Sequence, residues 1–415
     1  MTSRTRLWVL LISTPVIAFA IIGGYLGQVM AKDETYQHLR VFEDVVSLVL
    51  NNYVEEVDVK KAMKGAMNGL SDNLDADSAF LPANVAAAYE ANQPAAPADI
   101  GIELSRQYYL RVIAVHDGSP AAKAGLRVGD FIRAIDKRST KDISIYEGER
   151  LLHGQPGSKV SLLVIRGSAA DPHDVALTRE RVPTPPELTS KMADATTGYI
   201  HIVEFTKRSP VQIKQAIDAL AKTGATRYVI DLRGATRGDL DDAVTAARLF
   251  VKSGTLTVRE TKGNKETVAA QTGDGTIAAP LVLIVNQSTA RSGEVFAAAL
   301  DGSKRAEMIG EHTVGSAARQ KLVKLPDGSA MLLSYVRYLA PNGNVIHEKG
   351  LQPEVIVDEP DVEFGAPAPT TDVTLQKALE YFSQKKAASN VRTERFERSE
   401  RLERPERLMY TDRSG

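Results

Sequence analysis

Strand-length apolar runs that alternate with helical segments dominate the chain between residues 198 and 300. Two runs, YVIDL (228–232) and PLVLIV (280–285), are almost entirely apolar, which is typical of strands buried on both faces of a parallel sheet. Segments with helical spacing alternate with the apolar runs of this region: 210–222 precedes the first of these two runs, 240–251 lies between them, and the stretch after Ser292 follows the second. This alternation predicts an α/β layer with helices on both faces of its sheet.

A polar segment, NQSTARSGEV (286–295), stands where the second apolar run turns into a helix. Backbone N–H groups converge at such a turn and can hold an anion, so it is a common place for a nucleophile. The hydroxyls of Ser288, Thr289 and Ser292 could attack a substrate, or they could cap the following helix, with Glu294 in its first turn. Capping is the interpretation that we adopt for all three.

The N-terminus carries a targeting signal. Arg4 and Arg6 precede an apolar run over residues 7–26, which is long enough to span a bilayer with its basic flank inside. Residues 29–31 also have the small-residue pattern of a cleavage site, so residues 1–34 form a signal anchor or a signal peptide. The length of the run favours an anchor. Either way, we expect the rest of the chain on the periplasmic or extracellular side of the cell envelope.

The composition excludes several kinds of site. Cysteine is absent, which removes disulfides, thiolate metal sites and a cysteine nucleophile. The seven histidines form no HExxH pair, so we expect neither a metal nor another cofactor. The net charge of −1 gives no indication of a nucleic-acid partner.

Two regions precede the α/β layer. Residues 35–92 have helical periodicity, with one helix expected from 59 to 74, and a linker follows at 92–98. Residues 99–167 change to short strands with one or two helices. Within them, SPAAKAGLRVGDFI (119–132) resembles the most specific segment of PDZ domains, so the region is identified as a PDZ domain with a β-sandwich-like fold.

The PDZ resemblance implies a site for polypeptide C-termini. A peptide adds to such a domain as an extra strand, and backbone N–H groups hold its carboxylate. The segment that corresponds to this site contains Ile100, Gly101, Ile102 and Leu104. Gly101 would let the backbone approach the carboxylate, while Ile102 and Leu104 would line the groove with the helix at 145–152. Glu103 in the carboxylate region counts against binding, and in the alternative the domain only packs on its neighbour.

Several further motifs carry a resemblance to the carboxyl-terminal processing proteases, peptidase family S41. The motifs are LSDNLDADSAFL (70–81), GYIHIVEF (198–205), IDLRGATRGDL (230–240), IGEHTVGSAARQ (309–320) and the strands of 325–357. In the first of them, Ala76 and Asp77 stand where the family has proline and histidine. The resemblance implies an S41-type α/β core over residues 186–358, after a connector at 168–190 that is rich in Pro, Asp and Thr. The fold class is therefore α/β plus PDZ.

The family's serine–lysine dyad is replaced in this chain. In the family a serine attacks the peptide carbonyl, a lysine held neutral by burial takes its proton, and a glutamine places the lysine. By this resemblance, alignment of the ends of the 286–294 segment puts the nucleophile on Arg291, and the 309–320 motif puts the lysine on Ser316 and the glutamine on Gln320. A guanidinium stays protonated, so Arg291 can neither attack nor act as a base.

The oxyanion motif is changed as well. The family's Asn-Pro-Gly-Gly corresponds to residues 235–238, so Arg237 replaces a glycine beside Gly238 on the oxyanion side. Arg237 and Arg291 are either tolerated substitutions or together bind an anion such as a peptide carboxylate.

These observations lead to a functional hypothesis. The chain would be an exported homologue, anchored in the membrane through residues 7–26, that binds polypeptide C-termini or unfolded protein without efficient cleavage. Such a pseudopeptidase would act as an adaptor or regulator, for example of an active relative. In one alternative the chain is an active serine endopeptidase that uses a displaced serine such as Ser292, although neither Lys304 nor Lys321 is well placed as its base. In another it is a structural envelope protein without a peptide groove.

The C-terminal region, residues 359–415, is expected to hold one helix and a charged tail. The helix is predicted over 373–383. A Glu-Arg-x repeat of period three then occupies residues 394–408, which indicates a solvated or disordered tail, with a partner-docking tail as the alternative.

Overall fold

The computed structural model describes residues 36–383, except 168–170, 359–361, 365 and 367–370. The chain divides into two compact units, residues 1–66 and 67–415. The predicted membrane segment and the Glu-Arg-x tail lie outside the described residues. Among the residues that are described, no helix is both long and apolar enough to cross a bilayer.

The predicted helical character of the N-terminal region is confirmed in large part. A helix covers residues 36–52 in the first unit, and α2 (Val59–Asp72) matches the helix expected from 59 to 74. Helix α3 (Ala83–Glu90) follows, but the short strand β1 (Ala79–Leu81) intervenes. Strand β1 pairs with β18 (Ala330–Leu339) of the core, and this pairing fixes the position of the 70–81 motif in the second unit.

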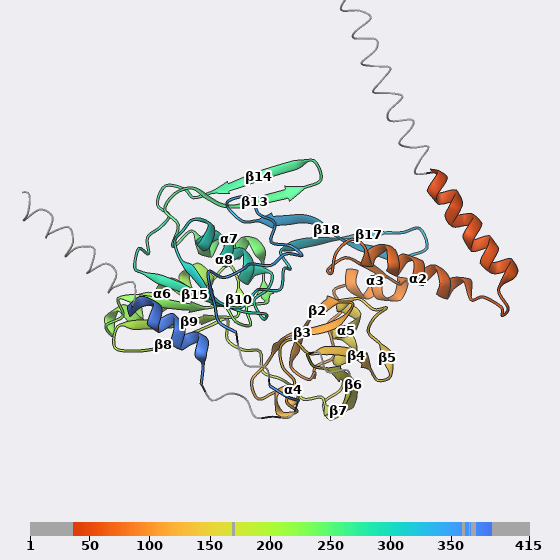
Figure 1. The fold of residues 1–415 in the computed structure, drawn as a ribbon, viewed down its shortest axis with the longest axis horizontal. Helices are drawn as coiled ribbons and strands as arrows, with labels where there is room; N and C mark the ends of the chain where they lie inside the picture. Colours follow the sequence, from red (N-terminus) through yellow and green to blue (C-terminus); the bar gives the residue numbers. More distant parts are fainter. Residues whose placement is uncertain (1–35, 168–170, 359–361, 365, 367–370, 384–415) are drawn as a thin grey trace, which may run out of the picture. The chain divides into compact units, whose positions relative to one another are not determined.

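The PDZ domain is built on one sheet with the strand order β2-β3-β4-β6-β7. Its strands are β2 (Ile102–Gln107), β3 (Tyr109–Val115), β4 (Phe131–Ile135), β5 (Arg138–Ser139, paired with β4), β6 (Lys159–Ile165) and β7 (His173–Thr178). Its helices are α4 (Pro120–Lys123) and α5 (Ile145–Leu152). Strand β2 lies at one edge of this sheet and packs against α5 (Figure 1).

The PDZ sheet extends beyond residue 167, where the sequence predicted its end, so that boundary was wrong. Strand β7 lies within the predicted connector and pairs with β6 along its whole length. Val175 and Leu177 are buried while Asp174 and Thr178 are exposed, as in a strand with one face on the core. The Pro and Asp residues around this short alternating pattern are typical of a connector, so the sequence did not indicate a strand there.

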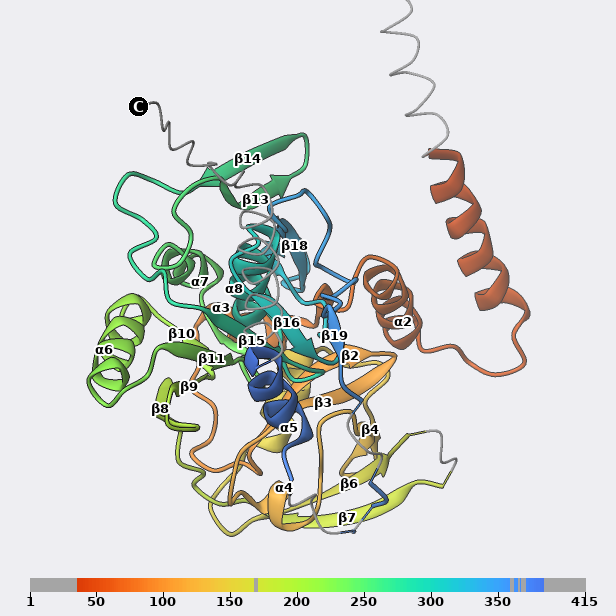
Figure 2. The same ribbon diagram turned by 60° about the vertical axis from the view of Figure 1, so that its left-hand side comes forward.

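The core sheet has the order β19-β16-β15-β11-β9-β8, and all its neighbours are parallel except β8 and β9. The strands are β8 (Leu188–Met192), β9 (Thr197–Ile202), β11 (Arg227–Asp231), β15 (Leu281–Val285), β16 (Glu307–Gly310) and β19 (Val355–Ile356). One face packs on α6 (Ser209–Lys222), α7 (Leu240–Ala247) and α8 (Ser292–Gly302). The other face packs on the helix at 373–383 (Figure 2). The predicted α/β layer with both faces covered is confirmed.

A second sheet and a small bridge complete the core. The second sheet joins β1, β18, β13 (Thr255–Thr261), β14 (Asn264–Ala269) and β17 (Ala318–Lys324). The bridge pairs β10 (Glu204–Phe205) with β12 (Arg237–Gly238) in parallel. Together these pairings bring the motifs at 70–81, 230–240, 286–295 and 309–320 to one region of the molecule.

Candidate functional site

Arg291 occupies a sharp turn between β15 and α8. Its backbone has φ 52° and ψ −115°, a combination that residues other than glycine rarely adopt. In α/β hydrolases a strained strand-to-helix turn of this kind exposes the nucleophile. The Arg291 side chain is partly buried and forms no hydrogen bond or ion pair with any described residue. The position aligned with the family's nucleophile thus lies at the apex of the turn.

The three hydroxyls around Arg291 do not cap α8, so that prediction is wrong. Each bonds to the neighbouring loop at 232–238: Ser288 accepts from Gly234 N (2.8 Å), Thr289 donates to Leu232 O (3.0 Å) and Ser292 donates to Arg237 O (2.6 Å). The Ser292 side chain is completely buried. The hydroxyls therefore hold the 286–292 loop against the 232–238 loop.

Glu294 is the residue that organises the start of α8. Its carboxylate is fully buried and accepts hydrogen bonds from the N–H groups of Arg291 (3.2 Å), Gly315 (2.6 Å) and Ser316 (2.7 Å), and from the Thr313 hydroxyl. Burial raises the pKa of Glu294 to about 7, although these four donors favour its charged form. Sequence reasoning gave Glu294 only a first-turn role and missed its link to the loop that carries Ser316.

Ser316, at the position of the family's lysine, is bonded to a carboxylate. Its hydroxyl donates to Asp77 Oδ2 at 2.7 Å, and its side chain is buried. His347 lies between two carboxylates, with Nδ1 3.8 Å from Asp77 and Nε2 3.7 Å from Asp75. Two departures from the family motifs, Asp77 for histidine and Ser316 for lysine, therefore lie in contact. Both departures are visible in the sequence, but their contact depends on the β1–β18 pairing.

Gln320 does not contact Ser316. Its Nε2 donates to the Ala318 carbonyl at 3.1 Å and lies 3.5 Å from the Ser334 hydroxyl, so its hydrogen bonds stay within β17 and β18. The neighbouring Lys321 is exposed. Gln320 thus keeps its place in the motif without a lysine to position.

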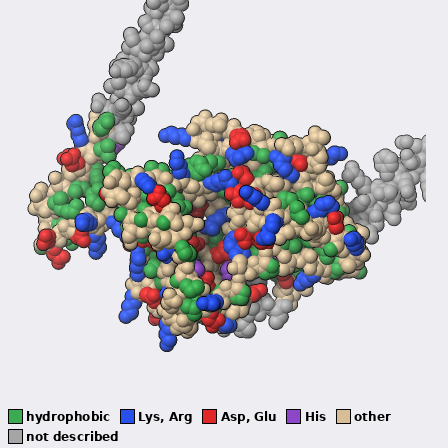
Figure 3. Space-filling view, turned by 180° about the vertical axis from the view of Figure 1, so that it is seen from behind, with side chains coloured by type: hydrophobic (Ala, Val, Ile, Leu, Met, Phe, Trp, Pro, Cys, Tyr) green, Lys and Arg blue, Asp and Glu red, His purple; other side chains and the backbone are tan. Residues whose placement is uncertain are grey.

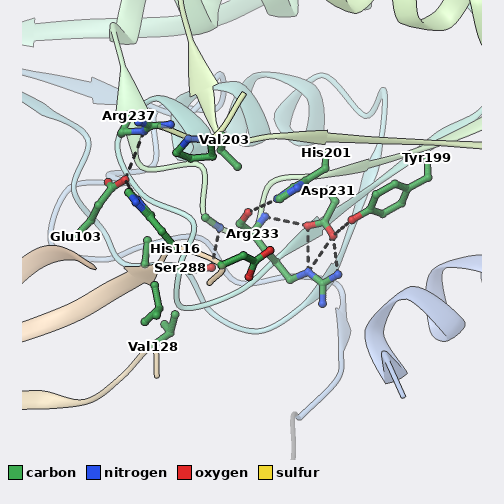
Figure 4. A pocket seen from close by; sticks show the side chains of 15 residues that line it. Glu103, His116, Val128, Tyr199, His201, Val203, Asp231, Arg233, Arg237 and Ser288 are labelled. Carbon is green, nitrogen blue, oxygen red and sulfur yellow. Dashed lines mark hydrogen bonds and ion pairs between the residues drawn. The ribbon is translucent and has the colours of Figure 1, made fainter. Parts of the chain in front are cut away.

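The oxyanion-side residues belong to the β10–β12 bridge. Gly238 has φ 98°, and a Cβ there would lie 2.0 Å from the Phe205 carbonyl oxygen, so only glycine fits. Arg237 Nε lies 3.4 Å from Glu103 Oε1 (Figure 4). Its Nη2 lies 3.5 Å from Glu204 Oε2. The hypothesis that Arg237 and Arg291 bind one external anion therefore needs correction, because Arg237 already faces two carboxylates of its own chain.

The predicted peptide-binding residues of the PDZ domain are mostly in its core. Ile100 and Leu104 are fully buried, and Ile102 is partly buried. The expectation that Leu104 lines an open groove is wrong, because Leu104 packs against α5 at Gly148, where an added Cβ would lie 3.4 Å from it. Gly101 has φ 76°, and an added Cβ would lie 2.3 Å from Ser119 Cβ, so glycine is required there. A ligand would meet the backbone of this segment rather than its side chains.

A cavity of about 290 Å³ lies between the PDZ domain and the core. Its polar lining includes Glu103 and His116 from the PDZ domain and His201, Arg233, Arg237 and Ser288 from the core (Figure 4). Most of these groups are already paired: His116 Nε2 lies 3.2 Å from Glu103, and Arg233 bonds to Asp231 and Asp372 at 2.6 Å. Over the ranges that the structure describes, no three His, Asp or Glu side chains could hold a metal ion.

Comparison with known proteins identifies both domains. Residues 196–357 match peptidase family S41, and residues 111–166 match the PDZ domain. The carboxy-terminal processing protease CtpA of Bacillus subtilis (strain 168) is 30% identical over 374 residues, which cover 87% of this chain and 79% of the relative. The carboxy-terminal-processing protease of Bartonella bacilliformis is 28% identical over 338 residues, covering 79% and 77%.

A solved structure supports the same relationship. The photosystem II D1 C-terminal processing protease superposes with a TM-score of 0.64 at 28% identity, covering 76% of this chain and 86% of that one. The match covers more of this chain than either domain alone.

Proposed function

Because this chain belongs to the carboxyl-terminal processing proteases of peptidase family S41, we propose that it binds polypeptide C-termini through its PDZ domain without cleaving them efficiently. The observation that carries the proposal is Arg291 at the apex of the β15–α8 turn. A serine–lysine mechanism needs a hydroxyl that attacks and a neutral amine that takes its proton. Arg291 has no hydroxyl at the nucleophile position and Ser316 has no amine at the lysine position, and loss of a catalytic serine typically lowers turnover by about a millionfold.

The remaining serines near the turn support the same conclusion. The Ser292 hydroxyl is buried and donates to the Arg237 carbonyl, so its proton points away from any incoming base. The Ser316 hydroxyl does donate to a potential base, Asp77, but Ser316 is buried and the Asp77 side chain is only 8% exposed. Attack by either serine would require the loop at 232–238 or the 70–81 segment to move.

Polypeptide binding rests on the PDZ domain. Strand β2 is at the edge of its sheet and faces α5, which is the arrangement by which a peptide is added as a further strand. In our proposal the N-terminal segment at 7–26 anchors the chain in the membrane, with its domains on the exported side of the cell envelope. The chain would there act as an adaptor or regulator that presents unfolded protein, for example to an active relative.

The test is incubation of the full chain with an unfolded protein substrate, followed by mass spectrometry, together with labelling by a fluorophosphonate probe. We expect no turnover and no labelled serine. Ser292→Ala and Ser316→Ala are matched variants, and neither should change the result.

Turnover by the unmodified chain that one of these variants abolishes would overturn the proposal. The variant that abolishes it would identify the displaced nucleophile. A probe attached to Ser292 or Ser316 would lead to the same conclusion independently of the substrate chosen.

A further inference from the structure

The PDZ domain contacts both loops of the family's catalytic region. Glu103 on β2 accepts a hydrogen bond from the Thr236 hydroxyl and lies 3.4 Å from Arg237 Nε. On β3, Arg111 donates to the Gln287 side chain in the 286–292 loop. The two contacts come from different PDZ strands and reach different core loops. They therefore fix the orientation of the domain as well as its position.

We propose that Arg237 forms a charge latch, which holds the PDZ domain against the core through Glu103. Arg237 stands where the family motif has a neutral glycine. The substitution on the oxyanion side therefore also supplies the cation of the latch. This inference goes beyond peptide binding, since the latch would hold the domain whether or not a polypeptide is bound.

The latch depends mainly on charge. Arg237 Nε and Nη2 are buried and form no hydrogen bond with described residues, so coulombic attraction to Glu103 and Glu204 holds the guanidinium. The side chains of Glu103 and Arg237 are only 15% and 23% exposed, which limits screening by solvent. Acidic and basic side chains intermingle over the face drawn in Figure 3, so the latch depends on where individual charges lie rather than on net charge.

The absence of cysteine allows a direct test. Spin labels at Thr178→Cys on the PDZ domain and Lys222→Cys on α6, both exposed sites, report the distance between the domains by double electron–electron resonance. We expect one narrow distance in the otherwise unchanged chain. It should broaden when salt rises from about 0.1 M to about 1 M, because the Debye length falls from about 10 Å to about 3 Å.

Variants then assign the effect to particular residues. Glu103→Arg should abolish the narrow distance, and the double variant Glu103→Arg/Arg237→Glu should regain part of it, because the arginine introduced at 103 would again face carboxylates, including Glu204. Lys214→Glu, which reverses a charge in an exposed pair with Asp218 on α6, is the matched control and should have no effect.

Two outcomes would overturn the latch. One is a narrow distance that neither high salt nor Glu103→Arg changes. The other is a double variant that is folded, as judged by circular dichroism, and whose distance distribution is as broad as that of Glu103→Arg alone. If Glu103→Arg itself fails to fold, Glu103→Gln and the salt series on the otherwise unchanged chain still decide the question.

Discussion

At the scale of single residues, the β15–α8 turn is strained at Arg291. A residue other than glycine at φ 52° and ψ −115° costs on the order of 1–3 kcal/mol. The surrounding contacts impose this conformation. Glu294 binds the N–H of Arg291, and the hydroxyls of Ser288 and Thr289 hold the loop on its other side. The framework of the turn is thus independent of the side chain at its apex.

This strain gives the first prediction. Arg291→Gly should raise the free energy of unfolding by about 1 kcal/mol relative to Arg291→Ala, because only glycine adopts this backbone conformation freely. Alanine removes the same side chain and keeps the strain, so it is the matched control. Urea denaturation of both variants measures the difference, and equal stabilities would show that the turn is unstrained.

His347 gives the second prediction, on pH dependence. Burial lowers the pKa of His347, but the neighbouring carboxylates of Asp75 and Asp77 more than compensate and raise it above the ordinary value. A raised folded-state pKa contributes stability that is complete below the unfolded-state pKa of about 6.5 and is lost as pH rises through the folded-state value. His347→Gln should therefore destabilise the protein more at pH 6 than at pH 9. Denaturation at both values tests this, and a loss that grows with pH would contradict it.

The sequence predicted some residues of the site and not others, for physical reasons. Arg291, Ser316 and Arg237 follow from the spacing of motifs, which is a local property of the chain. The bond between Ser316 and Asp77 joins residues 239 positions apart, and no local pattern encodes it. The capping prediction failed because the three hydroxyls form hydrogen bonds with the loop at 232–238 instead of with the first N–H groups of α8.

At the scale of secondary-structure elements, the β10–β12 bridge supports the oxyanion side. It consists of only two residue pairs, and Gly238 has the Phe205 backbone against the place of its missing side chain. The bridge also carries Arg237, whose carbonyl accepts the Ser292 hydroxyl. A short element therefore links β10, the start of α8 and the contact to the PDZ domain.

The third prediction concerns this bridge. Gly238→Ala should lower the free energy of unfolding by about 1–3 kcal/mol more than Gly254→Ala, because only the former adds overpacking to backbone strain. The two glycines have nearly the same φ, 98° and 95°, but an added Cβ at Gly254 meets nothing within 4 Å. Thermal or urea denaturation of both variants gives the comparison. Equal losses of stability in the two variants would mean that backbone strain alone, without overpacking, makes glycine necessary at position 238.

Elements were predictable where one periodicity dominated. Strands β11 and β15 are apolar runs, and α6 before β11 and α8 after β15 have helical spacing, so the existence of all four elements could be inferred. Strand β7 was missed because its alternation spans only six residues within a polar segment. Leu104 was misplaced because sequence alone does not show how closely α5 packs on β2.

At the scale of the whole molecule, the architecture of the S41 family is kept, with arginine and serine at the positions that align with its dyad. Domain order could be inferred from motifs spread along the chain, because each motif is specific to its domain. The contacts between the domains could not, since Glu103 with Arg237 and Arg111 with Gln287 each join residues more than 130 positions apart. Those contacts make the family's catalytic region a docking surface for its own PDZ domain.

The central claim, binding without cleavage, is tested most directly by one measurement on the full chain. A fluorescent peptide with a free C-terminal carboxylate is titrated and followed by anisotropy, and the same samples are then analysed by mass spectrometry. We predict saturable binding, weaker binding of the C-terminally amidated peptide, and an intact peptide at every time point. A shortened peptide, or equal binding of the acid and the amide, would contradict the account.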